Sequence, residues 1–135
     1  MYKEREYRNW VSSQDLVKFE VKEAQTDLLI CAERDLEKQA RQSVLNYRKD
    51  IEDYIIKDRS FYTSLDPVNV SVDAPEIVKA MARAAEAAGV GPMAAIAGAM
   101  AEFVGRDIAA SSGEVIVENG GDIFIKTSST RRVGI

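Results

Sequence analysis

The sequence predicts an α+β domain in which an antiparallel or mixed β-sheet is covered by helices on one side. Runs rich in Val, Ile and Phe occur at both ends of the chain, and three stretches with helical spacing fill the middle. A chain of 135 residues has room for one domain with a real core. We therefore expect a single domain over residues 1–135, with its elements in the order ββ-ααα-βββ.

The first β structure is expected at residues 5–11 and 15–32. In the second stretch Val17, Phe19 and Val21 alternate with charged residues, so their side of the strand should face a core. A short turn and a second apolar run follow, which predicts a hairpin over residues 15–32.

Residues 35–57 are predicted to form a long amphipathic helix, with Asp35 as its N-cap. The opposite face is charged and should be solvated. The apolar stripe has steps of three and four residues and consists of Leu36, Ala40, Val44, Tyr47, Ile51, Tyr54 and Ile55.

A second helix is predicted over residues 73–88, after a connector rich in Ser, Asp and Pro. Asp73 and Glu76 have the spacing of a capping box, and Pro75 falls in the first turn, where proline is tolerated. The glycines of "GVG" should end this helix. Its expected apolar stripe consists of Ile77, Met81, Ala84 and Ala88.

A third helix, at about residues 92–110, is unusually rich in small residues. Ala94, Gly98, Ala101 and Gly105 fall on one face. Each glycine inside a helix costs up to ~1 kcal/mol relative to alanine, and close approach of another backbone is the usual compensation. Two interpretations stay open, a helix packed against the sheet and a helix beside a bulky ligand.

The β structure returns over residues 114–135 as "EVIVE", "DIFIKT" and "RRVGI". Asn119, Gly120, Gly121 and Asp122 separate the first two runs, and Asn-Gly between such runs is a strong hairpin signal. A plain hairpin needs these glycines for their positive φ. The alternative is a bend kept bare beside a ligand, with Asp122 or Asn119 as a polar contact.

Composition excludes several kinds of chemistry. The chain contains no His and a single Cys, so an internal disulfide and a Cys-rich zinc site are excluded. Cys31 lies in the apolar run "LLICA" and should be a packing residue. Glu102 interrupts an apolar helix, and it either pairs with Arg106 or is partly buried.

The charge pattern bears on partners and location. A net charge of −4 without a basic cluster does not favour nucleic acid as a partner. The opening "MYKEREYRNW" is charged, and the longest uncharged run, Ala87 to Ala101, is shorter than the roughly 20 residues that span a bilayer. We therefore expect a cytoplasmic protein that is not a membrane partner. The chain stops at Ile135 within a predicted strand, which suggests the N-terminal part of a longer protein.

The blocks "AGVGPMAAIAGAMAEFVG", "EVIVENGGDIFIK" and "RRVGI" resemble an uncharacterised prokaryotic family related to ApbE, the FAD:protein FMN transferase. The segments "EREYR", "IEDYI", "SLDP" and "APEIVKAM" resemble the same family. The resemblance implies an ApbE-like fold and identifies the chain as similar to the N-terminal half of longer family members. FAD and magnesium are the cofactors expected from the superfamily.

In the wider ApbE group the matching helix starts D-L-G-G-I-A-K-G. Its Asp and Lys help to bind FAD, and a backbone carbonyl of the helix start helps to bind magnesium. On this chain the Asp position falls on Pro92 and the Lys position on Gly98. The helix and the glycine turn are kept while both charges are lost. The ligand-binding residues that the resemblance implies are Ala94, Ala95, Asn119, Gly120, Gly121 and Asp122.

These observations predict a protein that binds an anionic or nucleotide-like small molecule without transferring flavin, with a role in sulfur or cofactor metabolism. One alternative is an active FAD:protein FMN transferase, and a second is a structural module that forms a homodimer through the small-residue helix face. No catalytic residue or metal ligand stands out, and the sequence leaves open whether the protein is an enzyme.

Overall fold

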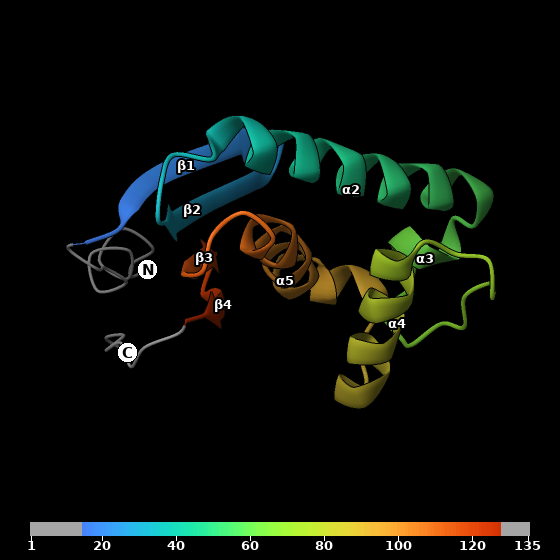
Figure 1. Cartoon of the computed structure of the whole chain (residues 1–135). Coiled ribbons are helices and arrows are strands. Elements are labelled where there is room, and N and C mark those ends of the chain that lie inside the picture. The colour runs from blue at the N-terminus through green and yellow to red at the C-terminus, as the bar shows by residue number, and fades with distance from the viewer. Residues whose placement is uncertain (1–14, 128–135) are drawn as a thin grey trace.

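A computed structural model describes residues 15–127, and the strands expected at residues 5–11 and 131–135 lie outside this range. The predicted α+β class is confirmed, with an antiparallel sheet and packed helices (Figure 1). The elements are β1 (Val17–Glu23), β2 (Thr26–Ala32), α2 (Glu37–Lys57), α3 (Ser60–Thr63), α4 (Glu76–Ala88), the 3₁₀ helix η1 (Pro92–Ala95), α5 (Ile96–Ala109), β3 (Val115–Asn119) and β4 (Asp122–Lys126).

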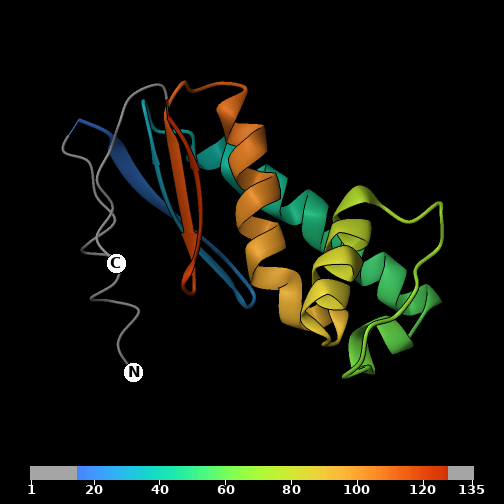
Figure 2. The same cartoon turned by 90° about the horizontal axis from the view of Figure 1, so that it is seen from below.

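The four strands of this sheet lie in the order β1-β2-β3-β4, and each neighbouring pair is antiparallel. β1 with β2 and β3 with β4 form the two predicted hairpins. The helical segment between β2 and β3 returns the chain to the free edge of β2 (Figure 2). One row across all four strands consists of Phe19, Ile30, Val117 and Phe124.

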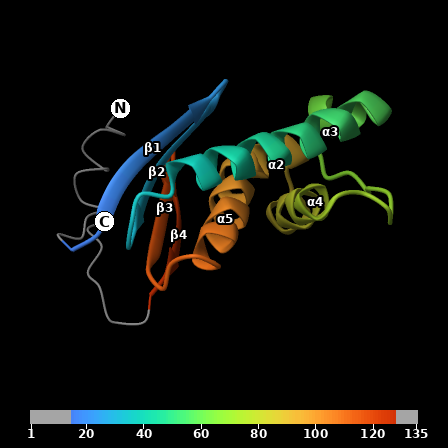
Figure 3. The same ribbon diagram turned by 45° about the horizontal axis from the view of Figure 1, so that its top comes forward.

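Helices α2 and α5 lie against one face of the sheet, and α3 and α4 lie farther from the strands (Figure 3). α5 packs on β3 and β4, and α2 packs on β1 and on α5. The side chains that fill the layer between sheet and helices are mainly aliphatic, and they include Val21, Leu28, Ile30, Val44, Met81, Met100, Val104 and Val117, all at most 1% exposed. Burial of this apolar surface is the main favourable contribution to folding.

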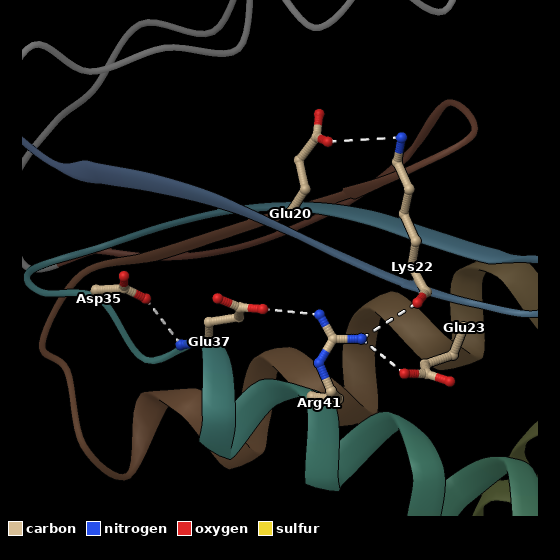
Figure 4. A network of polar contacts seen from close by, with 6 residues as sticks. All are labelled: Glu20, Lys22, Glu23, Asp35, Glu37 and Arg41. Carbon is tan, nitrogen blue, oxygen red and sulfur yellow. Dashed lines mark hydrogen bonds and ion pairs between the residues drawn. The ribbon is translucent and has the colours of Figure 1, made fainter.

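The stripe predicted for α2 faces the core, but the helix begins two residues later than predicted. Leu36 is at the N-cap position and makes no side-chain cap hydrogen bond. Asp35 still accepts a hydrogen bond, because the N–H of Glu37 donates to its Oδ1 at 3.0 Å (Figure 4). Arg41 joins this helix to β1 by donating to the Lys22 carbonyl at 3.2 Å and to Glu23 at 2.6 Å.

The capping box predicted for α4 is wrong. The helix begins at Glu76, with Pro75 at the N-cap and no side-chain cap hydrogen bond. The N–H of Asp73 instead donates to Ser71 Oγ at 3.1 Å in a turn before the helix. Proline disfavours the α conformation in the residue that precedes it, so Ala74 cannot continue the helix backward.

The apolar stripe predicted for α4 is also only partly right. Ile77 and Met81 are buried, whereas Ala84 and Ala88 are exposed. The inward face instead continues through Val78, Ala82 and Ala85, which shows that α4 is turned slightly relative to the prediction. Because alanine is tolerated on either side of a helix surface, the sequence specified this rotation only weakly.

The predicted third helix begins as η1 and continues as α5. Its expected packing against the sheet is confirmed at Gly105, where a Cβ atom would lie 2.1 Å from the Phe124 ring of β4. At Gly98 a Cβ atom would lie 3.3 Å from Asp122 Oδ1. Both neighbours are side chains, so the expectation that a second backbone approaches these glycines is wrong.

This difference predicts opposite outcomes for two substitutions in one helix. Gly105→Ala should lower the free energy of unfolding, because its Cβ would lie 2.1 Å from the Phe124 ring and overpacking typically costs ~1–3 kcal/mol. Gly98→Ala should be neutral or stabilising by up to ~1 kcal/mol, since alanine is the better helix former and the exposed Asp122 carboxylate can shift. Urea denaturation of both variants checks this, and equal midpoints would contradict the close contact at Gly105.

The other face of the sheet carries a smaller apolar cluster. Cys31 and Ile116 are at most 1% exposed there, with Leu16 and Ile123 packed beside them. The interpretation of Cys31 as a packing residue is confirmed by this burial. Strands whose residues are apolar on both sides need cover on both sides, unlike a sheet with one solvated face.

Within residues 15–127, no single helix is both long enough and apolar enough to cross a membrane. Only taken together are Glu76–Ala88 and Pro92–Ala109 long and apolar enough, and the chain bends by 104° between them.

Candidate functional site

The candidate site lies where the start of α5 meets the β3–β4 hairpin. Gly120 and Gly121 both have positive φ, at 56° and 102°, and they join β3 to β4 in the predicted hairpin. Asn119 and Asp122 are Cα partners at the end of the ladder. The N–H of Gly121 donates to Glu118 Oε2 at 3.2 Å, which ties the turn to its own strand.

The two polar residues of the turn reach α5 on different sides. Asn119 Nδ2 donates to the Ala97 carbonyl at 3.1 Å. Asp122 lies against Gly98, where an added Cβ atom would be 3.3 Å from Asp122 Oδ1. Because Gly98 has no side chain, a space remains between the helix and the turn. The turn therefore holds the first turn of α5 in place, and its two polar side chains face separate hollows.

The first hollow has a volume of about 320 Å³, within the usual range for small-molecule sites. It brings together three of the predicted site residues, Ala94, Ala95 and Asp122. The sequence-based set did not include the other lining residues, which are Ala80, Ala84, Gly98, Ala99 and Glu102. Glu102 could have been predicted from the sequence, because it lies four residues after Gly98 and therefore on the same helix face.

The remaining predicted site residues lie elsewhere. Asn119 lines a second hollow, of about 440 Å³, on the other side of α5. Gly120 and Gly121 line neither hollow, and a Cβ atom on either would meet nothing within 4 Å. The positive φ of both glycines, not a close approach by another group of the described structure, accounts for them.

The first hollow is acidic. Its charged lining residues are Asp122 and Glu102, and no Lys or Arg lines it among the described residues. Glu102 forms the predicted ion pair with Arg106, whose guanidinium also lies 5.7 Å from the centre of the Phe103 ring. Across residues 15–127 no hydrogen bond or ion pair engages the Asp122 side chain, which is exposed. Carboxylates in this position favour hydroxyl and amino groups as ligands and disfavour phosphate.

The residues of this site do not fit a flavin pyrophosphate with its magnesium ion. The helix start carries Pro92 and Gly98 where the transferase motif has a carboxylate and an ammonium group. Within the described range no group of three or more His, Cys, Asp and Glu residues could hold a metal ion. The carboxylate and the ammonium group of the transferase motif are therefore not supplied by the side chains at these two positions.

The fold and site define a small α+β domain with a ligand-sized hollow between a helix start and a glycine turn. Residues 8–135 match the family described as "AbpE bacteria", and the chain belongs to this ApbE-like family.

Several archaeal proteins are similar to this chain. A UPF0280 protein of Methanococcus aeolicus is 44% identical over 97 residues, covering 71% of this chain and 39% of the relative. Those of Methanopyrus kandleri and Archaeoglobus fulgidus are 42% and 41% identical, covering 82% and 87% of this chain and 45% and 50% of the relatives. The chain thus spans half or less of the length of these relatives.

Proposed function

We propose that this chain is the small-molecule-binding part of an ApbE-related protein, and that its ligand is nucleotide-like and binds in the acidic hollow between α5 and the 119–122 turn. The observation that carries the proposal is the Asp122 carboxylate, which faces a hollow walled by alanine and glycine. Small walls leave room for a flat or compact group, and one exposed carboxylate supplies its polar contact.

The charge of the hollow decides which part of such a ligand enters it. A ribose or an amino-bearing base offers O–H and N–H donors to Asp122. A phosphate group would meet Asp122 and Glu102 without a cation from the lining. We therefore expect the phosphate group of a nucleotide-like ligand to stay outside the hollow.

The proposal also excludes flavin transfer as the activity of this site. A hydrogen bond to a charged group contributes about 1.5–3 kcal/mol, and both charged residues of the transferase motif are replaced here. Two such losses correspond to roughly a hundredfold weaker binding or more. The homodimer alternative receives less support, because Ala101 and Gly105 are already buried within the chain, Gly105 against Phe124 of β4.

Two titrations of the full natural chain test this function. Adenosine should bind at least as tightly as AMP by calorimetry, and Asp122→Asn should weaken adenosine binding while leaving the thermal midpoint near wild type. Lys126→Gln, an exposed change at the other end of β4, is the matched control. Affinity for adenosine that is unchanged in Asp122→Asn would remove Asp122 from the site.

The second titration concerns flavin. The protein should purify colourless, and FAD with magnesium should leave flavin fluorescence unchanged. After incubation with FAD, magnesium and a Thr- or Ser-containing acceptor peptide, intact mass should show no added FMN. Micromolar FAD binding, or an acceptor carrying the mass of FMN, would restore the transferase alternative.

A further inference from the structure

The second hollow lies on the other side of α5 from Asp122 and belongs to a different part of the surface. With a volume of about 440 Å³ it is the larger of the two. Helical periodicity places its α5-side lining, Ile96, Ala97 and Met100, opposite Gly98 and the acidic hollow. The complete lining comprises Gln25, Thr26, Arg48, Ile51, Glu52, Ile55, Tyr62, Met93, Ile96, Ala97, Met100 and Asn119.

The walls of this hollow are mostly apolar. Ile51 and Ile55 come from α2, and Met93, Ile96 and Met100 come from η1 and α5. Apolar walls favour a ligand with a hydrocarbon body, because its transfer from water is favourable. Methionine is unbranched and polarisable, so two methionines allow the walls to adjust to the shape of that body.

One cation is fixed at this hollow. The Arg48 side chain is 18% exposed, and its Nη1 donates to Thr26 Oγ1 at 3.0 Å. Thr26 is itself 6% exposed, so the guanidinium is held by a buried group of the sheet. Its Nη2 lies 3.2 Å from Glu52 Oε2. A carboxylate thus already occupies the position that a ligand's acid group would take.

The Glu52 carboxylate is replaceable. Its side chain is 61% exposed, so the carboxylate returns to water when it leaves Arg48 and is not left desolvated. Nη2 of Arg48 also donates to Gln25 Oε1 at 3.5 Å. Rotation of Glu52 toward solvent would leave Arg48 bound to Thr26 and Gln25, with the N–H that now meets Glu52 free. Arginine presents a planar pair of donors that matches a carboxylate.

We propose that this hollow binds an apolar carboxylic acid, whose carboxylate replaces that of Glu52 at Arg48 and whose hydrocarbon body packs on Met93, Ile96 and Met100. Asn119, held by its hydrogen bond to Ala97, supplies a further polar group to the lining. The site is independent of the proposed nucleotide-like ligand, which lies across α5.

The methionine methyl groups give a direct readout in the wild-type protein. The sequence has four methionines; Met93 and Met100 line the hollow, and Met81 is buried in the core and does not line it. With ¹³C-methyl methionine labelling, titration with octanoate should shift the Met93 and Met100 signals and leave Met81 unchanged. Octanol, the matched neutral compound, should bind roughly tenfold more weakly or worse, because it cannot pair with Arg48.

A pair of variants on α2 tests the role of the charge. Arg48→Met keeps an apolar stem and should reduce octanoate affinity by roughly tenfold or more, with octanol affinity unchanged. Lys49→Met is the control, since Lys49 is 74% exposed, pairs with Asp53 and does not line the hollow. Absence of shifts at Met93 and Met100, an equal shift at Met81, or equal affinities of the two variants would overturn the proposal. The wild-type titration decides the matter even if Arg48→Met fails to fold.

Discussion

Gly91→Ala is expected to be among the most destabilising single changes in this chain. A Cβ atom at Gly91 would lie 1.9 Å from the carbonyl oxygen of Ser64 and 3.2 Å from the Cα of Leu65. Both are backbone atoms of the segment that follows α3, so no side-chain rotation relieves the clash. Gly91 has φ −74° and ψ 157°, which alanine adopts readily, so the cost is purely one of packing.

Overpacking of this kind typically costs ~1–3 kcal/mol, and the upper end applies where backbone must move. Gly113→Ala is a suitable control, because its added Cβ would meet only the carboxylate end of Glu33, at 3.2 Å. Urea denaturation monitored by circular dichroism should show a large fall in midpoint for Gly91→Ala and a change within about 0.5 kcal/mol for Gly113→Ala. Similar midpoints would show that the backbone at Ser64 and Leu65 does not pack against Gly91.

Asp107→Ala is the second change expected to have a large effect. The Asp107 carboxylate accepts the Ser43 hydroxyl at 2.7 Å and the Tyr47 hydroxyl at 3.0 Å, and so joins α5 to α2. Ser43 is buried, so the substitution leaves a desolvated hydroxyl without its acceptor. Hydrogen bonds to charged groups contribute about 1.5–3 kcal/mol each, and loss of this pair should cost about 3 kcal/mol.

Tyr47 provides an independent readout of this contact. Burial, and then its hydrogen bond to Asp107, raises its pKa from 10.0 to about 12. Above pH 10 the unfolded chain loses this proton first, so the stability contributed by Tyr47 is complete below pH 10 and is lost toward pH 12. Tyr47→Phe should remove this part of the alkaline loss, and Asp107→Ala should reduce it. An alkaline profile of Tyr47→Phe identical to wild type would contradict the raised pKa.

Much of the fold was predictable because its signals are local. The inward side of β1 at Phe19 and Val21 depends only on the strand period of two, although Val17, at the start of the strand, is 40% exposed. The stripe of α2 depends only on the helix period of 3.6. The Asn-Gly-Gly-Asp hairpin followed from the rarity of positive φ outside glycine. The start of α4 was predicted wrongly because a capping box is only a pattern of residue types, and the turn at Ser71 competed for the same N–H group.

The candidate site was predictable only in part. Ala94, Ala95 and Asp122 share one hollow, but Ala80 and Ala84 complete it from a helix whose rotation the sequence did not specify. Asn119 lies next to the turn glycines in sequence and yet faces the opposite side of α5. Asn119 and Asp122 are paired across the hairpin, but α5 lies against the hairpin so that each faces a different side of this helix. This placement depends on tertiary packing.

By itself the sequence determined the α+β class, the two hairpins, the long amphipathic helix and the family resemblance, since each rests on periodicity, glycine conformation or a continuous motif. The tertiary structure alone decided what the small residues do. Gly91 accommodates the backbone at Ser64, Gly105 accommodates the Phe124 ring, and Gly98 leaves a space beside Asp122. A glycine in the sequence does not indicate which group will lie against it, so only the packed fold distinguishes these three roles.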